Sequence, residues 1–390
     1  MTKRLLKKLF TGFIGGVVIA LAITIVTAAS ATTSFYYEVT DLGDLDTTNI
    51  FDLSQAYDIN NVGQVVGESV SSVRQTSAGS YQGFFHPFKW ENEMMSDLGI
   101  PASNFGDFSS PAIAINNLGQ VVGYRTNGES IFRGGSPASA TESRASASAI
   151  TRLVTHAVLW RKNTRIDLGT LGGSESRAYD INDAGQVVGY SVDSSQARRA
   201  FLWQDGTMTD LGTLGGNSSS AEGINNKGQV VGSSSTTAGF SHAFLWQNGT
   251  MLDLGTLGGN ISFASAINNK GQVVGYSAFT TSSGYYHIFL WSNGVMTDLG
   301  SLGGDVIYAT AINNAGVVVG FGHVTPEPGQ YHGFVCRNGE ITDLNTLLPP
   351  NSGWFIDYAS GINNKGQIVG SGSFNGKGRA FLMTPVRVTT

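Results

Sequence analysis

Short apolar stretches recur along most of the chain, and turn-forming residues separate them. One segment of 43 residues holds four such stretches, at about 221–224, 229–232, 243–246 and 251–254. Asn-x-x-Gly divides the first two, and Asn248-Gly249, a dipeptide typical of tight β-hairpins, divides the last two. No 3.6-residue periodicity accompanies them. The pattern therefore predicts four short antiparallel strands in each segment.

The same segment recurs seven times. The motif Ile-Asn-x-x-Gly-x-(Val/Ile)-Val-Gly begins at Ile59, Ile115, Ile181, Ile224, Ile267, Ile312 and Ile362. An Ala stands three residues before each of these isoleucines, and an Asp-Leu pair precedes each Ala. A further element, His-Ala-Phe-Leu-Trp in its fullest form, ends at Trp90, Trp160, Trp203, Trp246, Trp291, Cys336 and Met383. Four strands in each unit of 40 to 45 residues are typical of a β-propeller blade. We therefore predict an all-β, seven-bladed β-propeller of four-stranded antiparallel blades.

The two ends of the repeat array complement each other. The last repeat stops after Ala380 to Met383 and lacks an Asp-Leu strand, whereas residues 36–42 supply Asp41-Leu42 without a preceding Phe-Leu-Trp strand. We predict that the Ala-x-x-Ile strand is innermost and the Asp-Leu strand outermost in each blade. The N-terminal strand would then pair with the C-terminal blade and close the ring, which removes exposed sheet edges.

The first 31 residues differ from the rest. Four basic residues, an apolar run from Phe13 to Val26 and the small residues 29–31 are typical of a secretory signal peptide. We expect residues 32–390 to form one propeller domain that is secreted or held in the cell envelope, with no membrane span after cleavage. An uncleaved N-terminal anchor is the alternative. A Ser/Ala-rich loop insertion is expected at about 126–152.

Composition narrows the function classes. The chain has 52 Gly in 390 residues and 13% charged residues, against about 7% and about 25% in ordinary soluble domains. The repeat turns and hairpins account for 32 of these glycines. The formal net charge of −5 offers no basic surplus for phosphate, so we predict no nucleic-acid partner. The single Cys excludes an internal disulfide.

The repeats resemble a known family. His242-Ala243-Phe244, together with Asp-Leu-Gly-Thr-Leu-Gly-Gly at 167–173, 210–216 and 253–259, is similar to the HAF family of extracellular repeats. The resemblance covers nearly all of residues 32–390. It implies a bacterial protein that is secreted or associated with the envelope, and it implies no particular activity.

Residues at repeated positions are interpreted as structural. Five histidines share one repeat position, where two repeats carry Arg199 and Arg379 instead: His86, His156, His242, His287 and His332. Equivalent positions on different blades lie too far apart to share one ion, so we predict that these histidines hydrogen-bond within the blade. The Asp of each Asp-Leu pair should accept hydrogen bonds from the glycine turn that follows, and Cys336 should be a buried apolar residue. No metal, cofactor or catalytic residue is predicted.

Binding residues are expected where the repeats differ. The Asp-Leu to Ala spacing is 15, 15 and 16 residues in repeats one, two and seven, and 11 in the others. These longer loops would neighbour one another in a closed ring, and inserted loops commonly form binding faces. The candidate ligand-binding residues are Asp46, Phe51, Phe105, Asp107, Phe108, Trp354, Phe355 and Asp357.

Aromatic faces with carboxylates suit an extracellular glycan or peptide, so the sequence favours a binding or scaffold protein. The same aromatics would alternatively only pack the loops onto the blades. A second interpretation is an extracellular polysaccharide hydrolase or lyase, with acid and base roles among Asp44, Asp46, Asp107 and Asp357.

Overall fold

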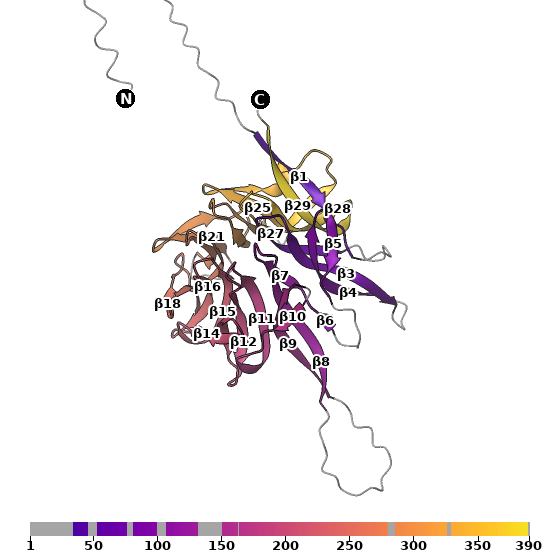
Figure 1. Ribbon diagram of the computed structural model, residues 1–390. Coiled ribbons are helices and arrows are strands. Elements are labelled where there is room, and N and C mark those ends of the chain that lie inside the picture. Colours follow the sequence, from indigo (N-terminus) through magenta and orange to yellow (C-terminus); the bar gives the residue numbers. More distant parts are fainter. Residues whose placement is uncertain are drawn as a thin grey trace, which may run out of the picture. The chain divides into compact units, whose positions relative to one another are not determined.

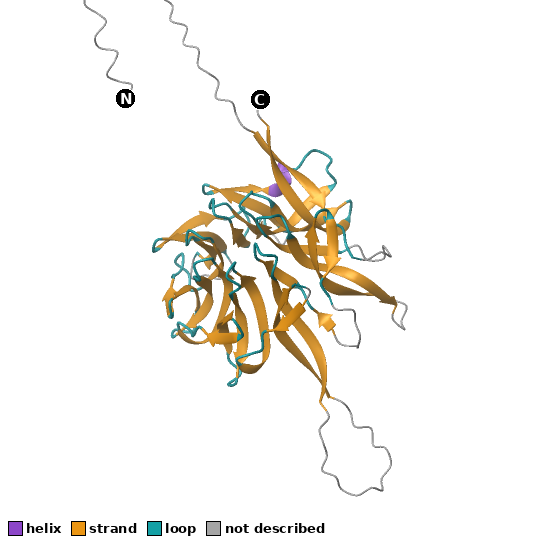
Figure 2. Ribbon diagram, in the orientation of Figure 1, coloured by secondary structure: helices purple, strands orange, loops and turns teal. Residues whose placement is uncertain are grey.

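The protein consists almost entirely of β-strands (Figures 1 and 2). The computed structural model describes residues 34–45, 53–75, 81–99, 107–131, 150–162, 164–279, 285–325 and 329–388. Residues Phe35–Arg387 form one compact unit. The predicted signal peptide and most of the predicted insertion at 126–152 lie outside the described residues. None of the helices in the described ranges has the length and apolarity needed to cross a membrane.

Four sheets each hold one sequence repeat, with the strands in chain order. They are β2(Ser54–Ile59), β3(Val65–Gln75), β4(Tyr81–Glu91) and β5(Met94–Asp97); β15(Gly215–Ile224), β16(Val230–Thr236), β17(Ser241–Gln247) and β18(Thr250–Asp253); β19(Ser262–Ile267), β20(Val273–Ala278), β21(Tyr286–Ser292) and β22(Val295–Gly300); and β23(Ile307–Ile312), β24(Val318–Gly322), β25(His332–Arg337) and β26(Glu340–Asp343). The predicted all-β chain of four-stranded antiparallel units is thereby confirmed.

Repeats two and three belong to one larger sheet. Its strands are β6(Asp107–Ser109), β7(Ala112–Ile115), β8(Val121–Ile131), β9(Ile150–Arg161) and β10(Thr164–Asp167), followed by β11(Gly172–Ile181), β12(Val187–Asp193), β13(Arg198–Gln204) and β14(Thr207–Asp210). A single parallel contact, between Glu175 and Thr155, joins the two groups, and the remaining pairs are antiparallel.

The first and last strands of the chain share a sheet. Its order is β1(Ser34–Asp41), β29(Lys377–Val388), β28(Ile368–Phe374) and β27(Trp354–Ile362), and β1 and β29 lie side by side in Figure 1. Tyr37 of β1 is 1% exposed, and its hydroxyl accepts a hydrogen bond of 2.5 Å from Arg337. The short 3-10 helix η1 (Leu344–Leu347) leads from β26 towards β27.

The glycine of Val-Val-Gly is required by the approach of neighbouring strands. A Cβ placed on Gly232 in β16 would lie 2.0 Å from the carbonyl oxygen of Ser220 in β15. The pairing register of these two strands shifts between Ala221 and Gly223, as in a β-bulge. Any larger residue at position 232 would therefore push the first two strands apart.

Apolar side chains of consecutive repeats pack together. In one cluster, Val231 and Leu245 of repeat four contact residues of repeat five that include Ile267 and Phe289. The repeated Phe is fully buried in six of the seven repeats: Phe88, Phe201, Phe244, Phe289, Phe334 and Phe381. Cys336 takes the place of Trp and is 2% exposed, as predicted for an apolar residue. Burial of each such phenylalanine stabilises the fold by about 1.5–3 kcal/mol.

The repeated His and Asp connect the third and fourth strands of a repeat. His242 Nδ1 lies 2.8 Å from Asp253 Oδ2, and the same contact, at 2.7–2.8 Å, occurs at His86, His156, His287 and His332. In each of these aspartates the other carboxylate oxygen accepts a backbone N–H two residues further on, as Asp253 does from Gly255. The structural roles predicted for both residues are confirmed.

Candidate functional site

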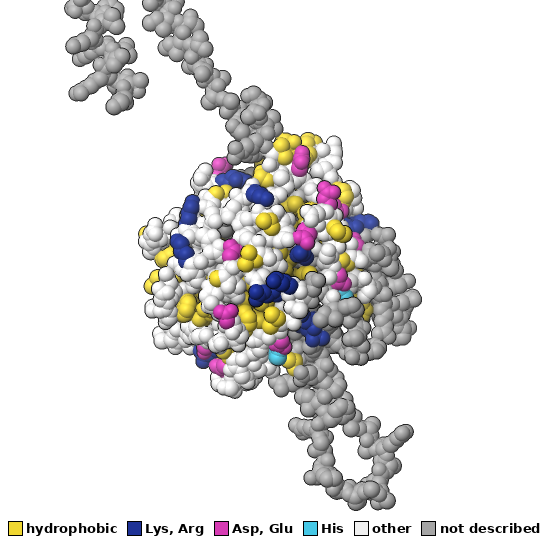
Figure 3. Space-filling model, viewed as in Figure 1, with side chains coloured by type: hydrophobic (Ala, Val, Ile, Leu, Met, Phe, Trp, Pro, Cys, Tyr) yellow, Lys and Arg dark blue, Asp and Glu magenta, His cyan; other side chains and the backbone are white. Residues whose placement is uncertain are grey.

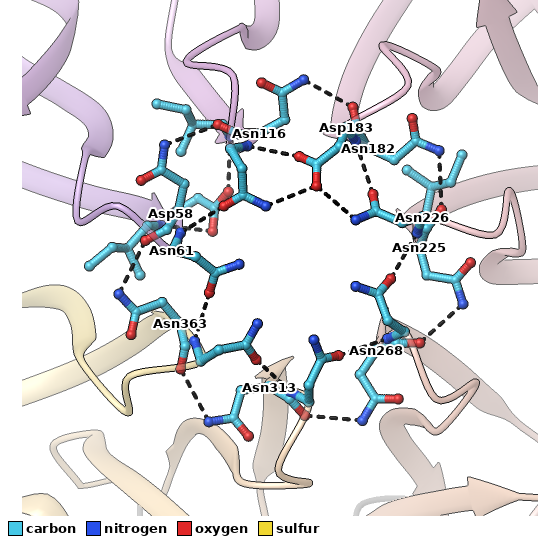
Figure 4. A pocket seen from close by; sticks show the side chains of 18 of the residues that line it. Asp58, Asn61, Asn116, Asn182, Asp183, Asn225, Asn226, Asn268, Asn313 and Asn363 are labelled. Atoms are coloured by element: carbon cyan, nitrogen blue, oxygen red, sulfur yellow. Dashed lines mark hydrogen bonds between the residues drawn. The ribbon is translucent and has the colours of Figure 1, made fainter.

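Asparagine side chains connect all seven repeats at the end of their first strands (Figure 4). Asn225 Nδ2, for example, donates to the backbone carbonyl of Asn268 in the next repeat at 3.0 Å. The series runs through Asn60, Asn116, Asn182, Asn225, Asn268, Asn313 and Asn363, and Asn363 donates to the carbonyl of Asn60. The residue after each Asn forms a second series, in which a backbone N–H donates to the side-chain oxygen of the following repeat.

These two series surround a polar cavity of about 160 Å³. Asp183 takes the place of Asn in repeat three and accepts amide protons from Asn117 and Asn226 at 2.9 and 2.7 Å. Burial raises the pKa of Asp183, but these hydrogen bonds outweigh burial and leave it below its usual value. The Oδ1 atoms that line the cavity accept backbone protons, so their part in it is structural.

A second set of side chains forms a surface that we call the aromatic belt. It occupies two repeat positions: the residue before the Ala of the first strand and the residue after Val-Val-Gly of the second. The two positions are cross-strand partners, as in Arg177–Tyr190, Phe263–Tyr276 and Tyr308–Phe321. Side chains that are cross-strand partners contact each other on the same face of a sheet.

Charged residues accompany the belt in repeats one to three. Tyr57 donates a hydrogen bond to Glu68 at 2.6 Å. The guanidinium of Arg177 lies 4.5 Å from the ring centre of Tyr124, and its Nε donates to Glu175. Tyr190 donates to the same Glu175 oxygen at 2.5 Å, and Arg198 lies 3.7 Å above the Tyr190 ring.

Aromatic rings continue the belt through repeats five to seven. Phe263 stacks on Tyr276 with ring centres 5.1 Å apart, and Tyr276 meets Tyr308 edge to face at 4.7 Å. Tyr308 contacts Phe321, which in turn lies 4.8 Å from Tyr358. Tyr358 is 37% exposed and the other four rings are half-buried, so their edges remain accessible.

Repeat four interrupts the belt. Ser220 and Ser233 are the cross-strand pair at the belt positions, and a cavity of about 310 Å³ lies beside them. We call this cavity the serine pocket. It is lined by Arg198, Glu222, Phe263 and serines that include Ser218, Ser220, Ser233, Ser235 and Ser241.

The structure describes three of the candidate residues from the sequence in detail. Trp354 stacks on Phe374 with ring centres 4.8 Å apart, packs against the core of repeat seven, and borders a cavity of about 480 Å³ beside β1. Phe355 contacts the ring of His332 edge to face, and Asp357 accepts a hydrogen bond from Gln330 at 2.9 Å. Burial raises the pKa of Asp357. Their role in ligand binding stays a prediction.

The other candidates lie at or beyond the limits of the described residues. Asp46, Phe51 and Phe105 fall outside them, and the side chains of Asp107 and Phe108 are not described. Asp44, considered for acid–base chemistry, forms an ion pair with Arg379.

The sequence reasoning missed the belt because it looked for variation in the loops. The signal that could have found it lies inside the strands. The residue after Val-Val-Gly is Glu68, Tyr124, Tyr190, Ser233, Tyr276, Phe321 or Ser371, whereas the glycine before it is invariant among the repeats.

Charge does not gather on the face drawn in Figure 3. Lys and Arg are interspersed there with Asp and Glu. Within the described ranges, no group of three or more His, Cys, Asp or Glu is arranged to hold a metal ion.

Comparison with known proteins identifies the fold class. A family model described as "Protein of unknown function (DUF3466)" matches residues 18–140, and a comparison with curated proteins finds no match. The β-propeller domain of the Trilobed protease from Pyrococcus furiosus is similar over 87% of this chain and 99% of that chain, at 10% identity and a TM-score of 0.50.

Two further solved structures are similar at lower TM-scores. The WD40 β-propeller domain of Doa1 matches 89% of this chain and 97% of its own, at 11% identity and a TM-score of 0.43. TolB from Acinetobacter baumannii matches 83% and 82%, at 14% identity and 0.39. The protein is therefore similar in fold to β-propellers.

Proposed function

We propose that the chain is a seven-bladed propeller closed by its own N-terminal strand, with the belt as its binding surface. The pairing of β1 with β29 supports closure, as does the hydrogen bond from Asn363 back to Asn60. Arg379 also contacts both Asp41 and Asp44, so the Arg of repeat seven meets the Asp-Leu pair that the N-terminus supplies.

The observation that carries the binding role is the belt itself. Aromatic rings that keep exposed edges on a rigid scaffold offer ligand contact at little entropic cost. The charged groups among them would fix the orientation of a ligand through directional hydrogen bonds. The proposed role is that of a binding module, and the predicted signal peptide and the resemblance to HAF repeats favour a secreted or envelope location.

The test is a binding screen of residues 32–390 against extracellular glycans and peptides, followed by variants of the hits. The double variant Tyr308→Ala, Tyr358→Ala should weaken binding at least about tenfold, because hot-spot aromatics commonly contribute that much. Leu252→Ala is the matched control, since Leu252 is 50% exposed on β18, away from the belt. Equal binding by the double variant and the control would reject the belt as the binding surface.

A further inference from the structure

Repeat four departs from its neighbours at the two belt positions. Repeat three carries Arg177 and Tyr190 there, repeat five carries Phe263 and Tyr276, and repeat four carries Ser220 and Ser233. The missing side-chain volume leaves the serine pocket between two filled parts of the belt. At about 310 Å³ the pocket lies at the lower end of the range for small-molecule sites, about 300–1,000 Å³.

The serines of the pocket have two different roles. Ser219 and Ser234 serve the fold, because Ser219 Oγ donates to the Gly212 carbonyl and Ser234 Oγ accepts from Leu214 N–H. Ser233 and Ser241 also line the pocket, and neither hydroxyl makes a hydrogen bond with another residue in the described ranges. These two hydroxyls are therefore available to a ligand as both donors and acceptors.

The charged groups of the pocket form one connected network. Arg198 Nη2 donates to Ser220 Oγ at 2.9 Å, and Ser220 Oγ donates to Glu222 Oε1 at 2.7 Å. Burial raises the pKa of Glu222, against the lowering effects of Ser220 and Arg198. A cationic ligand would meet Arg198, and an anionic ligand would meet Glu222. A neutral ligand rich in hydroxyl groups would meet neither penalty and could use both residues as hydrogen-bond partners.

We propose that the serine pocket binds one ring of a neutral sugar, with Phe263 as its apolar wall and the serine hydroxyls, Glu222 and Arg198 as its polar partners. A sugar ring has an apolar face of C–H groups and a rim of hydroxyls, and the pocket offers one aromatic wall and many hydrogen-bonding groups. A peptide side chain would leave most of those groups unsatisfied, at a cost in affinity. This inference rests on the proposed binding function and names its ligand class.

The chain supplies its own blocking variant. Ser233→Tyr places in repeat four the residue that repeat three has at Tyr190, and the third-strand partner is Ala in both cases, Ala243 and Ala200. The new ring should fill the pocket and leave the fold unchanged, which thermal melting would check. Ser371→Tyr is the matched control, because Ser371 occupies the same repeat position in repeat seven, outside the pocket.

The experiment is isothermal titration of residues 32–390 with a panel of neutral gluco-, manno- and galacto-oligosaccharides, and with cationic and anionic peptides. We expect binding of at least one neutral oligosaccharide, a loss of at least about tenfold in Ser233→Tyr and in Phe263→Ala, and no loss in Ser371→Tyr. No binding by any neutral oligosaccharide, or unchanged binding by a folded Ser233→Tyr, would overturn the proposal. Binding of peptides alone would overturn it too.

The Tyr308→Ala, Tyr358→Ala variant separates this proposal from the function on which it rests. If that variant loses binding and Ser233→Tyr does not, the belt is a binding surface and the pocket is not its sugar site. If neither variant changes the binding of any ligand, both proposals fail.

Discussion

Asp58 and Asp180 occupy a repeat position that the other five repeats fill with Ala or Gly. Asp180 Oδ1 accepts the N–H of Ile181, and its Oδ2 accepts the N–H of Ile224 in the next repeat at 2.8 Å. Asp58 makes the same two kinds of contact, to Ile59 and Ile115. Protein atoms enclose both carboxyl groups, and loss of water around the charge raises the pKa of both, that of Asp180 to about 7.

This environment predicts a pH-dependent stability. The pKa of Asp180 rises from 3.8 in the unfolded chain to about 7 in the folded protein, so the folded state binds the proton more tightly. The stabilisation is fully present below pH 3.8 and is lost as the pH rises through about 7. Asp180→Asn cannot ionise, so its urea-unfolding free energy should decline less over this range than that of the wild type.

Asp183→Asn is the control for that measurement. Its pKa lies below the usual value, so Asp183 contributes stability that is present above about pH 4 and lost at lower pH. Asp183→Asn should therefore keep the decline between pH 4 and 7 that Asp180→Asn reduces. Identical pH profiles for wild type and Asp180→Asn would contradict the assignment.

The His–Asp contact predicts a modest stability effect that other repeats can rescue. His242→Ala removes a contact whose side chains are 22% and 42% exposed, so the loss should lie at the lower end of about 0.5–1.5 kcal/mol. His242→Arg should retain most of the stability, because Arg199 stands at this position in repeat three and contacts Asp193 and Asp210. An Arg variant no more stable than the Ala variant, by urea unfolding, would argue against this role.

Residues that serve the fold could be predicted from the sequence, and residues of the belt could not. His242 and Asp253 recur at fixed spacing, so their pairing follows from the hairpin between β17 and β18. The belt residues change chemistry from repeat to repeat, and nothing local marks Phe263 or Tyr308 as neighbours of other rings. Their contacts depend on how adjacent sheets face each other, which strand patterns do not encode.

The individual strands follow closely from local sequence. Asn248 and Gly249 both have positive φ, of 51° and 82°, as a tight hairpin turn requires, and they connect β17 to β18 as predicted. The elements that local patterns could not give are the long loops of repeats one and two, where Gly and Pro are sparse and the spacing is unique.

The strand with most influence on the whole sheet array is β1. Tyr37 and Leu42 are 1% and 4% exposed, and they pack in two different core clusters. A chain that begins at residue 44 would leave β29 with an unpaired edge and would lose both side chains. We expect a large fall in melting temperature compared with a chain that begins at residue 32.

A milder variant covers the case in which the shortened chain does not fold. Leu42→Ala should cost about 2–5 kcal/mol, the usual range for a buried leucine, in urea unfolding. A melting temperature unchanged by removal of residues 32–43, or a negligible effect of Leu42→Ala, would refute the role of β1 in closing the array.

At the scale of the whole molecule, the two asparagine series are the features that treat all repeats alike. Asn225 and Asn363 are each 3% exposed and sit in the same local sequence, Asn-Asn-Lys-Gly-Gln. In both, Oδ1 accepts two backbone protons of its own turn, and Nδ2 donates to a Gln side chain and to the next repeat. They differ in one respect: Asn225 reaches the following repeat along the chain, and Asn363 reaches back to the first.

That difference makes urea unfolding of Asn225→Ala and Asn363→Ala, measured side by side, the most direct test of a closed ring. Each variant leaves buried backbone groups without partners, at about 1–3 kcal/mol for each group. The account predicts losses in unfolding free energy that agree within about 0.5 kcal/mol, because every repeat of a closed ring has a neighbour on both sides. A loss for Asn363→Ala clearly smaller than that for Asn225→Ala would show that the last repeat is not bound to the first, and would contradict the ring.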